Sequence, residues 1–300
     1  MIAERTELAP PNYHFFGQHM QSELPTLYLL HDAAELEAAL KRDLSAMFRL
    51  RIVGDWAALR DALKRCAPNS VAVVNPYLAS KPGEALSDQL SRMLANCPSS
   101  PVVAAFEVTP DRIPDLQRLH GWGVADVLDL REELTPSAVV HRFEVIRYHR
   151  IRVVLKGALP RSLPTRARAL ITAAAEVVSD GGQTTDLAAR LQLTERTLSR
   201  WCSKAGLPQP RRMFVWLRLL LAADMLWEGN RRSVAAVARA CGYASDASLR
   251  NAFKVVVKTT PAEVKEKGSF TTIAIPFREE LAKAREQARS SAKSPKSYLN

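Results

Sequence analysis

The 300-residue sequence predicts two domains, a parallel α/β domain in its first half and an all-helical domain in its second half. Short apolar runs alternate with helical apolar patterns before residue 155, which is typical of an open parallel sheet. Beyond residue 165 the apolar residues recur at helical spacing. The charge divides at the same place: residues 1–160 hold 18 Lys/Arg and 19 Asp/Glu, whereas residues 161–270 hold 18 and 9.

The strands of the α/β domain are expected as short apolar runs separated by helices. They are placed at 26–31, 48–53, 71–74, 102–106 and 124–128. The second run alternates apolar and polar residues, as an edge strand does, whereas the third and fourth are continuously apolar and suit the sheet centre. Asp32, with Glu35 as its capping-box partner, and Asp55 are expected to begin two of the helices. Another is expected to open at Thr135 with Pro136 in its first turn.

This layout, over residues 26–155, resembles the receiver domain of two-component response regulators. The resemblance implies a flavodoxin-like sheet of order 2-1-3-4-5, in which the second strand is an edge. It also implies a phosphoryl-accepting aspartate at the end of the third strand. Here Asn75 and Pro76 stand at that place, and an amide cannot act as a carboxylate nucleophile.

The other receiver positions are also altered. His31 and Asp32 follow the first strand and leave one carboxylate for a metal. Glu107 and Thr109 follow the fourth strand, and no lysine follows the fifth, which ends in Asp129-Leu130-Arg131. We therefore interpret the domain as a pseudo-receiver without chemistry. Its remaining role is binding, to itself, to another protein or to a small ligand.

Residues 156–165 are rich in proline and are expected to be a linker. After it, a helix is expected over 167–178, ending at Gly181-Gly182. Thr185 or Asp186 should cap the first helix of a helix-turn-helix pair, and Thr194 should cap the second.

A long helix over 210–228 joins this pair to a second one. Ser233 should cap the leading helix of the second pair and Ser245 its following helix, with Gly242 in the tight turn between them. Pro261 should begin a closing helix.

Helical spacing leaves a set of polar side chains outward on the second helix of each pair, where a recognition helix faces DNA. The expected DNA-binding residues are Arg196, Thr197, Ser199, Arg200, Lys204, Ser248, Arg250, Asn251 and Lys254. Arginine pairs with guanine and asparagine with adenine in the major groove, so Arg196, Arg200, Arg250 and Asn251 are expected to contact bases. Lys204, Lys254, Ser199 and Ser248 are expected to contact phosphates.

The two pairs, 51 residues apart from Leu198 to Leu249, make residues 166–268 resemble the DNA-binding domain of the AraC/XylS family of bacterial transcription regulators. The resemblance implies two recognition helices in successive major-groove segments, about 34 Å apart. Since the two helices differ in sequence, the site should be asymmetric. The chain departs from the family at Gln192 and at Lys258, where glycine is usual, and it lacks the family's β-rich effector domain.

The sequence therefore favours a sequence-specific DNA-binding transcription regulator whose pseudo-receiver serves dimerisation or signal input. A basic domain beside a neutral one fits this reading. Three alternatives stay open: a phosphorylation-controlled response regulator, an architectural DNA-binding protein with little sequence preference, and, weakest, an enzyme acting on DNA. No catalytic, cofactor-binding or metal-ligating residue is expected. The expected partners are double-stranded DNA, a second copy through the N-terminal domain, and an unidentified effector or protein.

Residues 1–25 are expected to be an irregular arm, and residues 269–300 a basic tail, helical to about Arg289 and disordered from Ser290. No signal peptide begins the chain and no apolar run reaches the roughly 20 residues of a membrane span, so a cytoplasmic location is expected. The four cysteines have no metal-site spacing and are expected to be buried thiols: Cys66, Cys97, Cys202 and Cys241.

Overall fold

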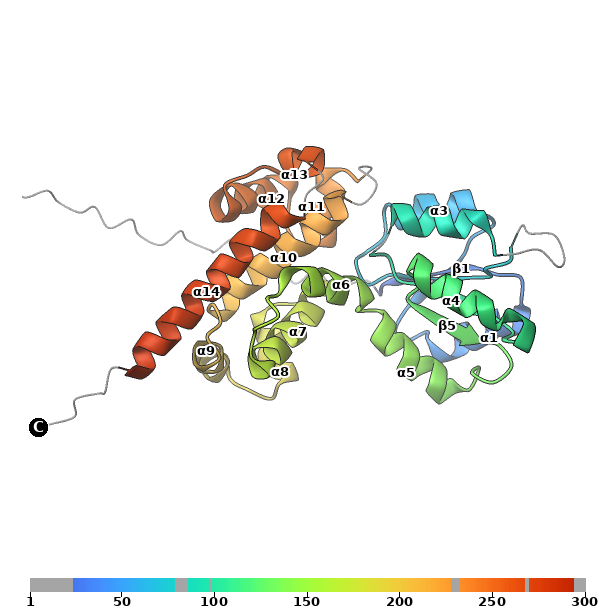
Figure 1. Ribbon diagram of the computed structural model, residues 1–300, viewed down its shortest axis with the longest axis horizontal. Helices are drawn as coiled ribbons and strands as arrows, with labels where there is room; N and C mark the ends of the chain where they lie inside the picture. The colour runs from blue at the N-terminus through green and yellow to red at the C-terminus, as the bar shows by residue number, and fades with distance from the viewer. Residues whose placement is uncertain (1–23, 79–85, 98, 228–231, 268–269, 294–300) are drawn as a thin grey trace, which may run out of the picture.

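The computed structural model describes residues 24–78, 86–97, 99–227, 232–267 and 270–293, and in it the chain forms an α/β half and a helical half side by side (Figure 1). Most of the predicted arm, residues 1–25, lies outside the described residues, as does the end of the predicted tail.

The described strands form one five-stranded sheet of order β2-β1-β3-β4-β5, with every neighbouring pair parallel. The strands are β1 (Thr26–Leu30), β2 (Arg49–Ile52), β3 (Val71–Val74), β4 (Val102–Phe106) and β5 (Asp126–Asp129). This confirms the predicted order. β3 and β4 are buried throughout, whereas the alternating β2 is an exposed edge.

Helices cover both faces of the sheet. Alternate strand residues divide between two apolar clusters, so that Leu27 and Leu29 face one layer and Tyr28 and Leu30 face the other. The first layer is α1 (Ala34–Asp43) with α5 (Pro136–Ile146), and the second is α2 (Trp56–Leu63), α3 (Asp88–Asn96) and α4 (Ile113–Trp122), preceded by a 3₁₀ turn (Pro110–Arg112).

Of the three predicted helix starts in the α/β half, two are right and one is wrong. Thr135 precedes α5, which begins at Pro136 as predicted. Asp55 caps α2, since its Oδ1 accepts the Ala58 N–H at 2.7 Å. Asp32 does not cap α1, because that helix begins at Ala34 and its cap position is Ala33. The Asp32 carboxylate instead accepts a hydrogen bond from the Asn75 amide at 3.1 Å.

The helical half is built around α10 (Pro210–Trp227), which is buried almost from end to end because apolar residues occur on all its sides. The other elements are α6 (His149–Ala158), α7 (Thr165–Ser179), α8 (Thr184–Arg190), α9 (Glu195–Lys204), α11 (Val234–Ala240), α12 (Asp246–Ala252), a π-helical turn (Phe253–Val257), α13 (Pro261–Lys267) and α14 (Thr271–Lys293).

Two segments expected to lie outside the core are part of it. In the expected linker 156–165, Ala158, Leu159 and Leu163 are buried in the helical core. The expected tail forms α14, which runs to Lys293 beside α10 (Figure 1). Its Phe277 is fully buried and packs on Trp216 with ring centroids 5.7 Å apart.

The two halves are joined by buried polar contacts that use the loops before β3 and β4. Arg150 of α6 pairs with Asp224 of α10 at 3.0 Å, and Ser100 accepts a second Arg150 hydrogen bond at 2.7 Å. The Ser99 hydroxyl donates to the Asp224 carboxylate at 2.7 Å. Because both charged side chains are at least nine-tenths buried, the pair is desolvated and depends on these partners.

A second contact joins α2 to the segment before α11. The Arg232 guanidinium donates to the Cys66 carbonyl at 2.9 Å and to the Leu63 carbonyl at 2.5 Å, so a cation lies at the carboxyl end of α2. A third contact joins Asn69 to Asp180 at 2.9 Å, at the end of α7.

Candidate nucleic-acid interface

The first helix pair, α8 and α9, is held by side-chain caps at both helix starts. Gln183, not Thr185 or Asp186 as predicted, caps α8, and Asp186 completes a capping box by accepting the Gln183 N–H at 2.6 Å. Thr194 caps α9 as predicted, since its hydroxyl accepts the Thr197 N–H at 3.2 Å. Leu198 of α9 is fully buried, which fixes which face of that helix points outward.

The second pair, α11 and α12, follows the prediction at both caps. The Ser233 hydroxyl accepts the Ala236 N–H at 3.2 Å and the Ser245 hydroxyl accepts the Ser248 N–H at 3.1 Å. Gly242 lies between them with a φ of +74°, the left-handed conformation that the tight turn requires.

The two departures from the family's glycines keep the glycine conformation. Gln192, in the turn between α8 and α9, has a φ of +54°, and Lys258, before α13, has a φ of +61°. Among the described residues these are the two non-glycine residues with positive φ. Both turns therefore take the backbone conformation that glycine adopts most easily, with steric strain between the Cβ atom and the backbone of each residue.

Three of the five predicted residues of α9 are plainly exposed. Arg196, Arg200 and Lys204 are exposed, whereas Thr197 and Ser199 are partly covered. The Thr197 hydroxyl accepts a hydrogen bond from the Thr194 hydroxyl at 3.0 Å and so belongs to the cap. Of the five predicted residues, the exposed ones are thus the three cations.

The second unit presents three of its four predicted residues openly. Arg250, Asn251 and Lys254 are exposed, whereas Ser248 is partly covered and its hydroxyl lies 3.0 Å from that of Ser245. Lys254 stands on the π-helical turn after α12.

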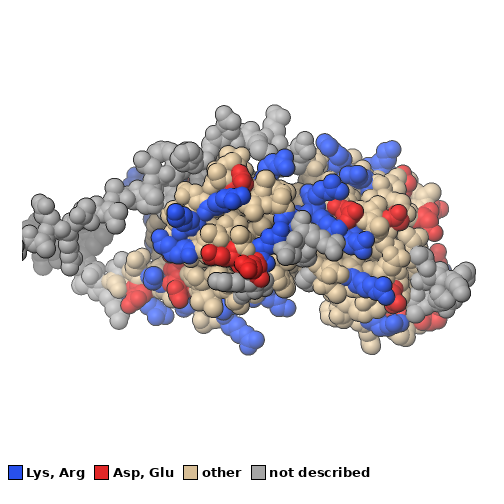
Figure 2. Space-filling view, turned by 90° about the horizontal axis from the view of Figure 1, so that it is seen from above, with Lys and Arg blue, Asp and Glu red and all other residues tan. Residues whose placement is uncertain are grey.

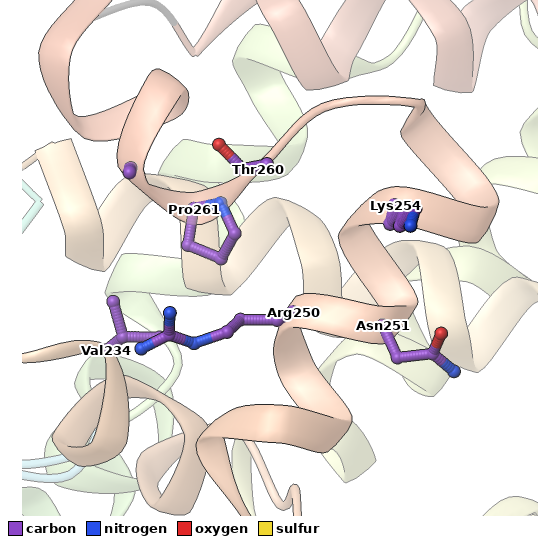
Figure 3. Close-up of a pocket in the computed structure, with 7 residues that line it drawn as sticks. Val234, Arg250, Asn251, Lys254, Thr260 and Pro261 are labelled. Carbon is purple, nitrogen blue, oxygen red and sulfur yellow. The ribbon is translucent and has the colours of Figure 1, made fainter.

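A hollow of about 220 Å³ lies beside α12 (Figure 3). It is lined by Arg250, Asn251, Lys254, Val234, Thr260, Pro261 and Ala262. In Figure 3 Arg250 extends toward Val234 below Pro261, while Asn251 points away from it. The sequence analysis predicted Arg250, Asn251 and Lys254 as DNA-binding residues but not the other four. The Thr260-Pro261 pair at the start of α13 was the available signal for part of that lining.

Both pairs are anchored on α10 through Arg218, which is 2% exposed. Its guanidinium donates to the Gly182 carbonyl, just before α8, at 2.9 Å. The same group lies against Gly242, where an added Cβ would come within 3.7 Å of it. Arg218 thus touches the turn of the second pair and the approach to the first.

The two pairs lie toward opposite ends of α10, and α9 and α12 both stand away from the α/β half (Figure 1). From above, Lys and Arg side chains cover parts of both halves, with Asp and Glu among them (Figure 2).

At the carboxyl ends of β1, β3 and β5, internal hydrogen bonds hold the polar side chains. His31 accepts the Ala33 N–H at Nδ1 (2.9 Å), so its Nε2 carries the proton and donates to the Ala105 carbonyl at 3.0 Å. Burial lowers the pKa of His31 and keeps it neutral. Asn75 bonds to Asp32, and Asp129 accepts the Val108 N–H at 3.2 Å.

All four cysteines are buried free thiols, as predicted. Burial raises the pKa of Cys202 and of Cys241 to about 12, so both stay protonated at neutral pH. Among the described residues no group of three or more His, Cys, Asp or Glu side chains is arranged to hold a metal. In the same ranges no helix has the length and apolar character needed to cross a membrane.

Comparison with protein families matches residues 187–267 to a helix-turn-helix domain of the AraC type, a DNA-binding domain of transcription regulators. That match spans α8 to α13 and so includes both pairs. No curated protein matches the chain. Among solved structures, full-length FixJ from B. japonicum is similar at 17% identity and a TM-score of 0.34, covering 72% of this chain and 95% of that one.

Proposed function

We propose that this chain is a sequence-specific DNA-binding transcription regulator, related to the AraC/XylS family, that reads an asymmetric duplex site through α9 and α12. The observation that carries the proposal is that two capped, differently composed recognition helices are anchored on one buried helix, α10. Since helices of different sequence contact different bases, one protomer reads two unlike blocks.

The base contacts come from Arg196 and Arg200 in the first block and from Arg250 and Asn251 in the second. All four side chains are exposed, as a group that enters the major groove must be. Arg250 pairs with Asp246 at 3.1 Å in the free protein, and both side chains are exposed, so the pair is weak and can open for DNA.

The phosphate contacts come from exposed cations and from hydroxyls beside them. Lys204 and Lys254 stand at the last turn of α9 and just past α12. Ser199 joins them on α9, while Thr197 and Ser248 contribute hydroxyls already held by the caps. Such contacts position the protein and carry no sequence information.

The proposal assigns a separate role to each half of the molecule. In the proposal residues 166–268 read DNA, the sheet with α1 to α5 forms the pseudo-receiver, and α6 with the segment to residue 165 packs on the helical half and connects the two. The pseudo-receiver is non-catalytic, and it serves dimerisation or signal input. In support, an amide occupies the phosphoryl-acceptor position and holds the neighbouring Asp32 in a hydrogen bond.

Selection of binding sites from randomised duplex DNA by the full chain tests the proposal. We expect enrichment of an asymmetric site with two blocks about one helical turn, roughly 34 Å, apart. Salt-sensitive binding without enrichment would instead identify an architectural protein and overturn the proposal.

Substitutions then separate the two kinds of contact. Asn251→Ala should cost about 1–3 kcal/mol and relax the preference at one position. Lys254→Ala should weaken binding to all sequences alike and lower the salt slope by about 1. Arg92→Ala on α3, also an exposed residue, is the control and should change neither. Equal losses on selected and random DNA for Asn251→Ala would refute its base contact.

A further inference from the structure

The two edge strands of the sheet, β5 and β2, differ in whether side chains hydrogen-bond to the main-chain groups that point away from the sheet. At β5 the outward Val127 carbonyl accepts from the Arg142 guanidinium, and the Val127 N–H donates to the Asp126 carboxylate at 2.9 Å. The next outward N–H, that of Asp129, donates to Glu133 at 2.8 Å. Side chains therefore block the β5 edge against further pairing.

At β2 no described residue pairs with the outer edge of the strand. The N–H groups of Arg49 and Val53 donate inward to β1 at 2.9 Å each, to the carbonyls of Pro25 and Leu29. Because alternate peptide groups of a parallel strand point to opposite sides, those of Leu50 and Ile52 point out of the sheet. No side chain in the described part of the chain hydrogen-bonds to them.

The two faces beside this edge differ in character. On the α1 face lies a hollow of about 340 Å³, lined by Leu27, Glu37, Leu40, Lys41, Leu44, Ser45, Phe48, Leu50 and Ile52. Ile52 is 55% exposed there, although it is a large apolar residue. An open strand edge beside an apolar hollow has the form of a strand-addition site.

The opposite face of β2 carries two cations. Arg49 and Arg51 alternate with Leu50 and Ile52 and are exposed, and Arg51 lies beside Tyr28 on the α2 side of the sheet. Within the described ranges neither arginine has a carboxylate partner. A strand added here would meet apolar side chains on one face and two unneutralised cations on the other.

We propose that the β2 edge binds an extended segment of a partner protein in which apolar and acidic residues alternate. The peptide groups of Leu50 and Ile52 supply the main-chain hydrogen bonds, the hollow takes the apolar side chains, and Arg49 and Arg51 take the acidic ones. A second copy of β2 fits less well, because its own arginines would face these two. The inference goes beyond DNA reading and stands independently of it.

The test uses the full chain and a labelled hexapeptide of alternating valine and glutamate, with a matched valine–lysine peptide. The glutamate peptide should bind in fluorescence anisotropy and the lysine peptide should not. Ile52→Asp should abolish binding, whereas Ile113→Asp should not change it. Ile113 is a matched control because it is 54% exposed on α4, away from β2.

Charge reversal gives the decisive comparison. Arg49→Glu with Arg51→Glu should weaken binding of the glutamate peptide about tenfold, because two attractive cross-strand charge pairs become repulsive, and should make the lysine peptide bind. Absence of binding by either peptide, or glutamate-peptide binding that survives Ile52→Asp or ignores the reversal, would overturn the proposal. Because DNA binding is measured in a separate experiment, failure of the DNA-binding proposal would leave the peptide-binding result unaffected.

Discussion

Gln192, in the turn of the first helix pair, tests whether backbone strain in that turn lowers the stability of the protein. A non-glycine residue at its φ of +54° costs about 1–2 kcal/mol relative to a right-handed conformation. Glycine removes that cost but gains about 0.4–1 kcal/mol of freedom in the unfolded chain. Gln192→Gly should therefore stabilise the protein by about 0.5–1 kcal/mol, a rise in Tm of about 1–4 °C in thermal unfolding followed by circular dichroism.

Two controls separate backbone strain from side-chain effects. Gln192→Ala removes the same side chain but keeps the strain, so its Tm should not rise. Gly181→Ala is the reverse change, because Gly181 has a φ of +77° with open space around its Cβ, and it should lower stability by about 1 kcal/mol. The reasoning would be refuted if Gln192→Gly raised Tm no more than Gln192→Ala does.

Three further substitutions test contacts elsewhere in the molecule. Asp224→Asn should lower the free energy of unfolding by about 3–5 kcal/mol in thermal unfolding, because it leaves the Arg150 cation buried without its carboxylate. The double variant Asp224→Asn with Arg150→Met should recover part of this loss. Arg232→Met should free the carboxyl end of α2 and speed hydrogen exchange around Cys66, with equal rates arguing against a clamp. Asn75→Asp should take up no phosphoryl group from acetyl phosphate with magnesium, since no lysine follows β5, and a mass increase would contradict this.

The sheet could be predicted because its signals are local. The continuous run Val71–Val74 marks a central strand and the alternating Arg49–Ile52 marks an edge, so the order follows from the pattern. The caps Thr194 and Ser245 were equally readable, since each side chain bonds within three residues of itself. Asp32 was misread because its partner, Asn75, is distant in sequence.

The packing of the C-terminal helix α14 could not be predicted from composition. The polar sequence of α14 suggested a tail, yet Phe277 and Leu281 fall on one face and are buried against the core.

Nothing in the sequence distinguishes the buried side chains of Arg150 and Arg232 from exposed arginines. Their burial depends on partners in the other half of the molecule, which only the tertiary fold brings near.

Two of the three contacts between the halves use the loop before β3, and this bears on how the α/β domain could influence DNA reading. The segment from Leu63 to Asn69 binds Arg232, whose main chain leads directly to the Ser233 cap of α11. It also binds Asp180, a few residues before the start of α8. One loop thus touches the chain just before each reading unit. On the proposed function, in which the two recognition helices read two blocks of one DNA site, a shift of this loop would change the affinity for both blocks together, whereas a change at either helix pair alone would alter one.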